Sequence, residues 1–253
     1  MDGTPSEKAS FTMLFSILSG GDPKSIIVSL LLMLPMMMLA LSAHEAAHGW
    51  MAYKCGDNTA YLMGRLTLNP VKHLDPIGFL AMLVFGYGWA NPVPVNSRRF
   101  RNPRRGMALT AAAGPVANLI IGIICSILFG ILLPVYSHMD FTSNNVFLMN
   151  CVKWLVIMFQ YGAWINFVFM TFNLIPLPPF DGSRIVFVFL PPKYYFGIMK
   201  YERQIMFGVL IALLAFSRLG GFSPFSWVAK QLTNLIARPV IDLFSRLLFP
   251  AFN

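Results

Sequence analysis

The chain has 253 residues, of which 57% are hydrophobic and only 11% are charged, and its formal net charge is +9 at pH 7. This composition is far more apolar than that of soluble globular proteins, so it excludes water as the main solvent of the chain. The positive charge does not indicate nucleic-acid binding, because the basic residues lie in short segments between long apolar runs, as in the cytoplasmic loops of membrane proteins.

Three long runs without formal charge predict helices that cross a membrane. Residues 25–44 form the first run, which is long enough at about 1.5 Å per residue to cross most of a hydrocarbon core. Residues 106–139 and 154–180 form the second and third, and the third ends in a cluster of prolines. We therefore expect three spanning helices in these positions.

Residues 76–97 form an apolar run that is too short for a comfortable span. Glycines and prolines interrupt it, and its apolar part ends near Ala90. If the run crossed the membrane, basic clusters would lie on both sides, against the positive-inside rule. These clusters are Lys54, Arg65 and Lys72 before the run and Arg98, Arg99, Arg101, Arg104 and Arg105 after it. The pattern favours a re-entrant segment, with both clusters in the cytoplasm.

This topology sends residues 106–139 outward and brings residues 154–180 back, so Asp181 reaches the same depth as Glu45. Residues 204–217 are a shorter apolar run, and residues 225–249 are an amphipathic helix that spans the membrane or lies in its interface. We predict an all-α polytopic membrane protein with about four to six transmembrane helices and a re-entrant segment, which could be a β-hairpin. Residues 1–253 are expected to form one domain, with its core at about 25–190 and C-terminal helices at about 203–249.

Residues 44–48 read His-Glu-Ala-Ala-His at the end of the first uncharged run. On a helix, His44 and His48 lie one turn apart on the same face and can bind one zinc ion, while Glu45 lies near enough to activate a water molecule. Ionisable residues at membrane depth need a metal, a partner or a water-filled cavity. An ordinary polar helix end would explain one histidine at this position, but it would not explain a glutamate that lies between two histidines. The motif therefore predicts a zinc-dependent protease.

A catalytic zinc site needs three protein ligands and an open position for water. Three scattered cysteines provide no Cys-x-x-Cys pair for such a site. Asp181 is the favoured third ligand, because it is the acid that ends a spanning helix at the right depth, and Gly182 allows the chain to turn there. The alternatives are His73, Asp75, Asp57 and His138, although the predicted topology places His138 on the opposite side of the membrane.

Two further motifs follow the first one. They are Gly-Pro-Val-Ala-Asn at 114–118 and Asn-Leu-Ile-Pro-Leu-Pro-Pro-Phe-Asp-Gly at 173–182. In this order the three motifs resemble the site-2 protease family of intramembrane zinc metalloproteases. Residues 64–78 are similar to a compact branch of that family without a PDZ or CBS domain, so the resemblance covers roughly residues 34–184. Phe180 stands where the family often has leucine, which is a conservative difference.

The resemblance implies roles for individual residues. The ligands are His44, His48 and Asp181, and the catalytic glutamate is Glu45. Asn173 and Asn118 are implied near the active site, where an amide can donate to an oxyanion or hold a substrate backbone. Either asparagine could instead simply join two helices by hydrogen bonds.

A substrate-binding segment is also implied. Residues 86–95 resemble the family's membrane-inserted β-hairpin, whose edge could pair with an unwound substrate strand. The residues implied to bind substrate are Asn91, Pro92, Val93 and Pro94. A role in packing alone is the alternative for this segment.

Together these observations predict a zinc-dependent intramembrane endopeptidase with one Zn²⁺ per chain. Its expected partners are transmembrane protein substrates and the lipid bilayer, with no nucleic acid, and the oligomeric state is left open. We expect a multi-pass protein of a prokaryotic cell membrane, with its site towards the cytoplasm. Rival interpretations are a membrane zinc transporter, an inactive protease-like protein, and a zinc protease of another family with Glu202 as the third ligand.

Overall fold

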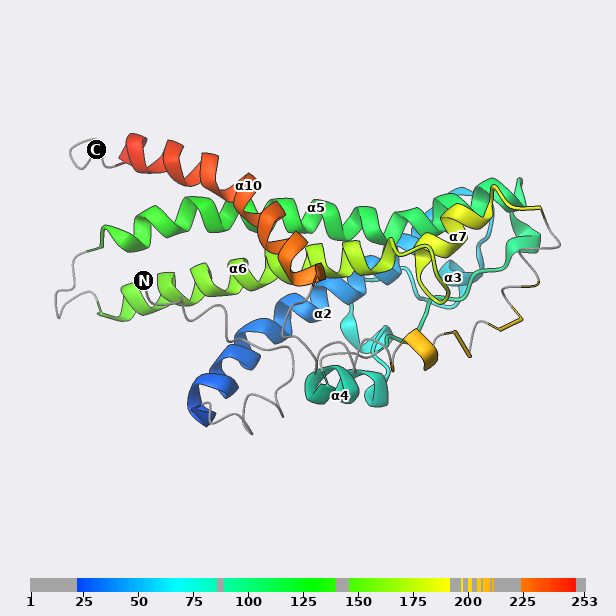
Figure 1. Ribbon diagram of the computed structural model, residues 1–253, viewed down its shortest axis with the longest axis horizontal. Helices are drawn as coiled ribbons and strands as arrows, with labels where there is room; N and C mark the ends of the chain where they lie inside the picture. Colours follow the sequence, from blue (N-terminus) through cyan, green and yellow to red (C-terminus); the bar gives the residue numbers. More distant parts are fainter. Residues whose placement is uncertain are drawn as a thin grey trace.

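The computed structural model describes residues 22–85, 89–139, 146–191 and 224–248, and isolated positions between 197 and 211. Three long helices form the body of the molecule: α2 (Pro23–Lys54), α5 (Pro103–Ser137) and α6 (Val146–Asn173). Figure 1 shows that α5 runs in the opposite direction to α2 and α6. Each contains a segment long and apolar enough to cross a membrane, namely Ile27–Lys54, Pro103–Ser137 and Val146–Asn173. The three predicted spans are therefore confirmed as helices of spanning length.

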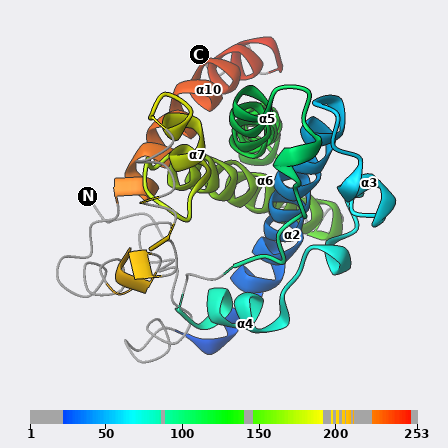
Figure 2. The ribbon, with the colours of Figure 1, turned by 90° about the vertical axis from the view of Figure 1, so that its right-hand side faces the viewer.

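Shorter elements lie between and after these helices. They are α3 (Thr59–Leu62), η2 (Pro70–Lys72), α4 (Pro76–Phe85), η3 (Ser97–Arg99), α7 (Asp181–Phe187) and α10 (Pro224–Leu248). Figure 2, a view along the bundle, shows α7 near the end of the bundle where α5 begins and α6 ends. The chain thus brings the C-terminal half of α2, the start of α5 and the start of α7 to the same end of the molecule.

Local sequence signals set the boundaries of the helices at this end. Asn102 caps α5, because its side chain accepts a hydrogen bond from the Arg105 amide at 3.2 Å, and Pro103 occupies the first helical position. α6 ends at Asn173, three residues before Pro176, in a stretch where prolines cannot continue a helix. The chain then turns, and α7 begins at Asp181.

Small residues allow the long helices to approach closely. A Cβ atom at Gly122 of α5 would come within 2.6 Å of the Phe167 ring of α6, and one at Gly162 of α6 would come within 2.9 Å of Cys125 Sγ. Close contact through small residues is how helices associate in a membrane, where lipid offers no hydrophobic driving force. α5 is the central element, since it contacts α2, α6, α7 and α10.

Two predictions about the fold are not confirmed. For residues 76–97, α4 is a helix of 10 residues, residues 86–88 lie outside the described part, and the chain then continues without regular structure to η3. The β-structure described in this stretch is one antiparallel bridge between Leu74 and Ala90, so neither a β-hairpin nor a re-entrant segment is established. A single bridge forms here because the prolines that follow Ala90 lack the amide hydrogens of a ladder.

The predicted number of membrane-spanning helices is the second prediction that is not confirmed. Among the described residues three helices qualify as spans, not four to six. Most of residues 204–217 lie outside the description. α10 packs across α5 and α6 (Figure 1), with Ala229, Thr233 and Ala237 buried against them, and it is not among the helices apolar enough to qualify as a span.

Candidate metal centre

His44 and His48 of α2 meet Asp181 of α7 in a compact cluster. The two imidazole Nε2 atoms lie 3.0 Å apart, and Asp181 Oδ2 lies 3.1 Å from Nε2 of His44 and 3.2 Å from Nε2 of His48. The side chains are 9%, 12% and 13% exposed for His44, His48 and Asp181. Three potential ligand atoms therefore form a nearly equilateral, largely buried triangle.

The donor set of this cluster fits zinc. Atoms about 3 Å apart can all lie roughly 2 Å from a common point, which is the usual distance from zinc to imidazole nitrogen and carboxylate oxygen. Asp181 Oδ2 is buried and has no hydrogen-bond partner, so a cation bound there would satisfy it. Two histidines and one carboxylate are also a common ligand set of catalytic zinc, with the fourth position left open.

The outer nitrogens of both imidazoles are held by oxygen acceptors. His44 Nδ1 lies 2.6 Å from Asn118 Oδ1, and His48 Nδ1 lies 2.6 Å from the carbonyl oxygen of Thr110. Because these oxygens only accept, each Nδ1 carries the hydrogen and each Nε2 presents a lone pair to the centre of the cluster. Partners of this kind fix the tautomer and the ring orientation of metal-binding histidines.

Asn118 of α5 is fully buried, and its amide is used completely by the protein. Its Nδ2 donates to the carbonyl oxygen of Ala40 at 3.2 Å and to Asn166 Oδ1 at 3.0 Å. Asn166, also fully buried, donates in turn to the carbonyl oxygen of Gly162 at 2.8 Å. Both hydrogens of Asn118 are therefore bonded within the protein and its Oδ1 is bonded to His44, so Asn118 joins α5 to α2 and α6 beside the cluster, and its implied role near the reacting atoms stays a prediction.

Gly114 of α5 forms the wall behind the two histidines. A Cβ atom at this position would come within 2.6 Å of His44 Cε1 and within 2.6 Å of His48 Cε1 and Nε2. Any side chain here would push the imidazoles away from Asp181. The glycine therefore belongs to the site through its lack of a side chain.

Electrostatics within the cluster favour an ionised carboxylate. Burial acts to raise the pKa of Asp181, but with protons on the Nε2 atoms of His44 and His48 the two imidazoles outweigh it and hold this pKa well below its usual range; a cation bound at the centre would take the place of these protons. Glu45, next to His44 on α2, accepts a hydrogen bond from the Val93 amide at 2.9 Å through Oε2. The site thus combines a ligand triangle with a neighbouring carboxylate that is held in place.

The other candidates for a third ligand have different partners. The ring of fully buried His73 bonds to the carbonyl oxygen of Thr67, Asp75 accepts from the Gly78 amide, and His138 bonds to the carbonyl oxygen of Pro134 at the far end of α5. Asp57 accepts hydrogen bonds from Thr59 and Asn96. Among the described residues, the cluster able to hold a metal ion is His44, His48 and Asp181. Glu202 lies outside the described residues.

Asn173 and the implied substrate-binding segment take separate places. The Asn173 amide donates to the carbonyl oxygen of Phe169 in its own helix at 3.0 Å, and no bond described for it reaches the cluster. Asn91 and Pro92 are exposed, whereas Val93 is buried against α2 and bonded to Glu45. The segment therefore adjoins the site, and its role in substrate binding stays a prediction.

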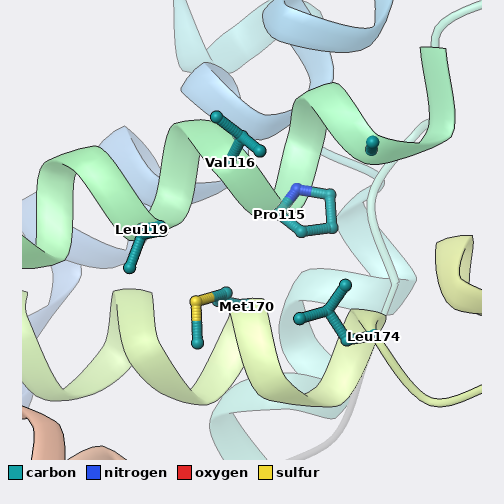
Figure 3. Close-up of a pocket in the computed structure, with 6 residues that line it drawn as sticks. Pro115, Val116, Leu119, Met170 and Leu174 are labelled. Atoms are coloured by element: carbon teal, nitrogen blue, oxygen red, sulfur yellow. The ribbon is translucent and has the colours of Figure 1, made fainter. Parts of the chain in front are cut away.

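A small apolar crevice of about 100 Å³ opens between α5 and α6 near this end of the bundle (Figure 3). Pro115 and Leu119 of α5 face Met170 and Leu174 of α6 across it, and Ala112 and Val116 complete the lining. Pro115 directly follows Gly114 in the chain, so the crevice lies on the neighbouring face of the same helix turn as the ligand cluster. Its lining can take only apolar groups.

Three contributors to the site were not predicted from the sequence. Asn166 carried a signal, because a polar residue within an apolar helix favours a buried hydrogen bond. Thr110 contributes a backbone carbonyl, which every residue has, so its type gave no signal. Arg65 was predicted only to contribute to a basic loop cluster, whereas its guanidinium donates to the carbonyl oxygens of Asn91 and Pro92.

Comparison with known proteins finds relatives of this chain. The profile of Peptidase family M50 matches residues 32–216. The protein "Putative zinc metalloprotease YwhC" of Bacillus subtilis is 38% identical over 214 residues, which are 85% of this chain and 91% of that protein. Two proteins named "Putative zinc metalloprotease Rip2" are each 25% identical: that of Mycolicibacterium smegmatis over 68% of this chain and 62% of its own length, and that of Mycobacterium tuberculosis over 73% and 67%. No solved structure matches the chain.

Proposed function

The chain belongs to peptidase family M50, the site-2 protease family, and on this premise we propose that it is a zinc-dependent intramembrane endopeptidase of the site-2 protease type. The observation that carries the proposal is the triangle of His44, His48 and Asp181, whose two histidines lie within a helix of spanning length. The family membership predicted from the sequence motifs is confirmed by the comparisons.

The proposed reaction is hydrolysis of a peptide bond by a water molecule. His44, His48 and Asp181 would hold Zn²⁺, which supplies a Lewis acid that polarises the scissile carbonyl and acidifies water. Glu45 takes the proton of the attacking water as general base and can return it to the leaving amine. Asn118 and the Thr110 carbonyl keep both imidazoles oriented during these transfers. No covalent intermediate with a side chain is required.

We infer that the substrates are transmembrane segments of other proteins. A helical segment in lipid satisfies its own backbone hydrogen bonds, so the helix must unwind locally before one of its peptide bonds can reach a buried site. Substrates with helix-breaking residues near the cleavage site should therefore be cleaved faster. The apolar crevice in Figure 3 suits an aliphatic side chain of such a segment.

The arginines near the start of α5 support a cytoplasmic location of the site. Arg98, Arg99, Arg101, Arg104 and Arg105 precede or open the helix whose residues Thr110 and Gly114 line the cluster. Because basic residues favour the cytoplasmic side, we propose a multi-pass protein of a prokaryotic cell membrane with its site near that side. The named relatives are bacterial, in agreement with this location. We further propose that residues 1–253 act as one membrane-embedded domain.

The decisive experiment replaces the general base and keeps the ligands. Purified protein should bind about one zinc per chain. Glu45→Gln should retain that zinc and lose cleavage of a co-expressed transmembrane substrate, measured by the ratio of cut to uncut product. Asp242→Asn on the exposed face of α10 is the matched control and should cleave normally. Full cleavage by Glu45→Gln would exclude the mechanism.

The rival interpretations give different results. A zinc transporter would move zinc into proteoliposomes with or without Glu45, and an inactive protease-like protein would bind zinc without any cleavage. A protease of another family would keep its zinc in Asp181→Ala and lose it in Glu202→Ala. We expect instead that Asp181→Ala loses its zinc and that Glu202→Ala keeps it.

A further inference from the structure

An extended segment, residues 91–96, runs beside the C-terminal half of α2, and we call it the strap. Its backbone is bonded to three separate parts of the chain. The Asn91 amide donates to the carbonyl oxygen of His73 at 2.8 Å, the Val93 amide to Glu45 Oε2 at 2.9 Å, and the Asn96 amide to Asp57 Oδ2 at 2.6 Å. The strap is therefore held at both ends, and its middle reaches Glu45.

The sequence of the strap leaves one amide hydrogen at its centre. Pro92 and Pro94 have none, so Val93 is the only backbone donor among these three residues. The residue before a proline is also restricted to extended conformations, which limits the direction in which the Val93 amide can point. That single, restricted donor is aimed at the carboxylate of Glu45.

Arg65 holds the other side of the same peptide bond. Its Nη2 donates to the carbonyl oxygen of Asn91 at 2.7 Å and to that of Pro92 at 3.2 Å. The Pro92 carbonyl and the Val93 amide belong to one planar peptide unit. This unit lies between the guanidinium of Arg65 and the carboxylate of Glu45, so its dipole is aligned by both groups.

Packing of the Val93 side chain against α2 sets the distance between the strap and this helix. The Val93 side chain is only 8% exposed. A Cβ atom at Gly49, one turn after Glu45 on α2, would come within 3.1 Å of Val93 Cγ1 and within 2.6 Å of Leu66 Cδ2. The absence of a side chain at Gly49 lets the strap lie close enough for the bond to Glu45.

We propose that Arg65 and the Val93 amide are positioning groups for Glu45. The amide holds Oε2, which stops the carboxylate from rotating and leaves Oε1 to take the proton of the attacking water. Arg65 keeps the peptide unit in the orientation that makes this bond. The inference rests on the proposed role of Glu45 as general base. It also gives the Pro-Val-Pro sequence a function other than pairing with substrate, since the amides of Asn91 and Val93 are already bonded within the protein.

The first test replaces the amide hydrogen of the strap. Val93→Pro exchanges this hydrogen for a ring carbon, so it deletes the donor and pushes Glu45 Oε2 away while keeping the extended backbone. Val93→Ala shortens the side chain and keeps the donor, so it controls for the loss of the valine side chain. With the zinc-loaded protein and a transmembrane substrate, kcat of Val93→Pro should fall about 10- to 100-fold below that of Val93→Ala. KM and zinc content should agree between the two variants within about twofold.

The second test leaves the backbone intact, so it holds even if Val93→Pro fails to fold. Arg65→Met should lower kcat by about 10-fold with zinc retained, and Arg65→Lys, which keeps a charged donor, should recover part of it. Arg98→Met, at an exposed arginine near the strap, is the matched control and should keep the kcat of the wild type.

A structural readout is independent of activity. Hydrogen exchange of a peptide covering residues 89–97 reports on few amides, because prolines contribute none. Glu45→Ala should release about one slowly exchanging amide hydrogen in this peptide, while the Asn91 and Asn96 amides stay protected. Absence of cleavage by the wild type would count against the proposed function, whereas unchanged exchange in Glu45→Ala would count against the strap.

Three kinetic outcomes would overturn the inference. Equal kcat values for Val93→Pro and Val93→Ala would show that the amide does not position the base. A higher kcat for Val93→Pro or Arg65→Met would show that the strap obstructs Glu45. A rise in KM alone would assign the strap to substrate binding instead.

Discussion

The site is supported from two sides that differ in chemistry. On the helix side, α5 and α6 hold the imidazoles of α2 through buried amides and a backbone carbonyl. On the loop side, the strap and the residues around it hold Glu45 through a backbone amide and a guanidinium. Within lipid every polar group must be satisfied by the protein itself, so the helix side uses a closed chain of neutral bonds. The loop side is partly exposed and can use charged groups.

Metal binding and proton transfer are therefore supported by different residues, which lie on opposite sides of the site. The helix side should decide whether zinc is bound and how its ligands are oriented. The loop side should decide how fast a protein that has already bound zinc turns over. Variants on the two sides should therefore separate metal content from kcat.

Loss of a ligand should have the largest effect. Asp181→Ala leaves two neutral imidazoles, and we expect zinc content to fall from about one per chain to less than about 0.1, with no measurable cleavage. Glu45→Gln should keep its zinc and lose cleavage to a similar degree. Metal analysis of both purified variants checks the separation, and equal zinc content in the two would contradict it.

Filling the wall of the cluster should come next. Gly114→Ala places a Cβ atom within 2.6 Å of both imidazoles, so they must move away from Asp181. We expect zinc affinity to fall by about 100-fold or more, measured by competition with a chelator. Val116→Ala, on the exposed face of the same helix, should leave affinity near that of the wild type. Normal zinc affinity in Gly114→Ala would show that the helices adjust freely.

The buried amide chain should have a graded effect. Asn118→Ala removes the acceptor of His44 and should weaken zinc binding by about 10- to 100-fold. Asn166→Ala removes only the partner of Asn118 and should have a smaller effect in the same direction. Asn150→Ala, on the exposed surface of α6, is the control. If Asn166→Ala weakened zinc binding more than Asn118→Ala, this would contradict the proposed hydrogen-bond chain, in which Asn166 acts on His44 only through Asn118.

Asp57 anchors the end of the strap and should affect stability more than catalysis. Burial acts to raise the pKa of this carboxyl, but hydrogen bonds from Thr59 and Asn96 and the charge of Arg99 hold the pKa below its usual value. The stabilisation is therefore complete above the usual carboxyl pKa of about 4 and is lost as the pH falls through the lower folded value.

We expect Asp57→Asn to lower the stability by about 1–3 kcal/mol at pH 7, measured by thermal unfolding in detergent. The difference between this variant and the wild type should shrink as the pH falls below about 4, because the unfolded wild-type chain binds a proton at Asp57 before the folded protein does, and it should be lost below the lower folded pKa. A difference that grows at acid pH would contradict the sign of the pKa shift.

The sequence by itself determined the elements with a periodic or compositional signal. Three uncharged runs predicted three helices of spanning length, because length and apolarity are properties of each run alone. The spacing of His44 and His48 placed both on one helix face, since a helix turns once in about 3.6 residues. Loop charge placed Asp181 at the depth of Glu45, and the structure brings Asp181 to the two histidines.

Only the tertiary structure decided how these pieces are held. It separated Asp181 from His73, whose imidazole could also bind zinc but is bonded to the carbonyl oxygen of Thr67. It also showed which groups Asn118 contacts, since its Oδ1 is bonded to His44 and its two amide hydrogens are bonded to Ala40 and Asn166.

The strap shows the physical reason most directly. The bond from Val93 to Glu45 uses a backbone amide and spans 48 residues of sequence. Every residue except proline has such an amide, so residue type carries no signal for it. What brings it to the carboxylate is the approach of two segments across Gly49, and long-range approach is set by the packing of the whole chain.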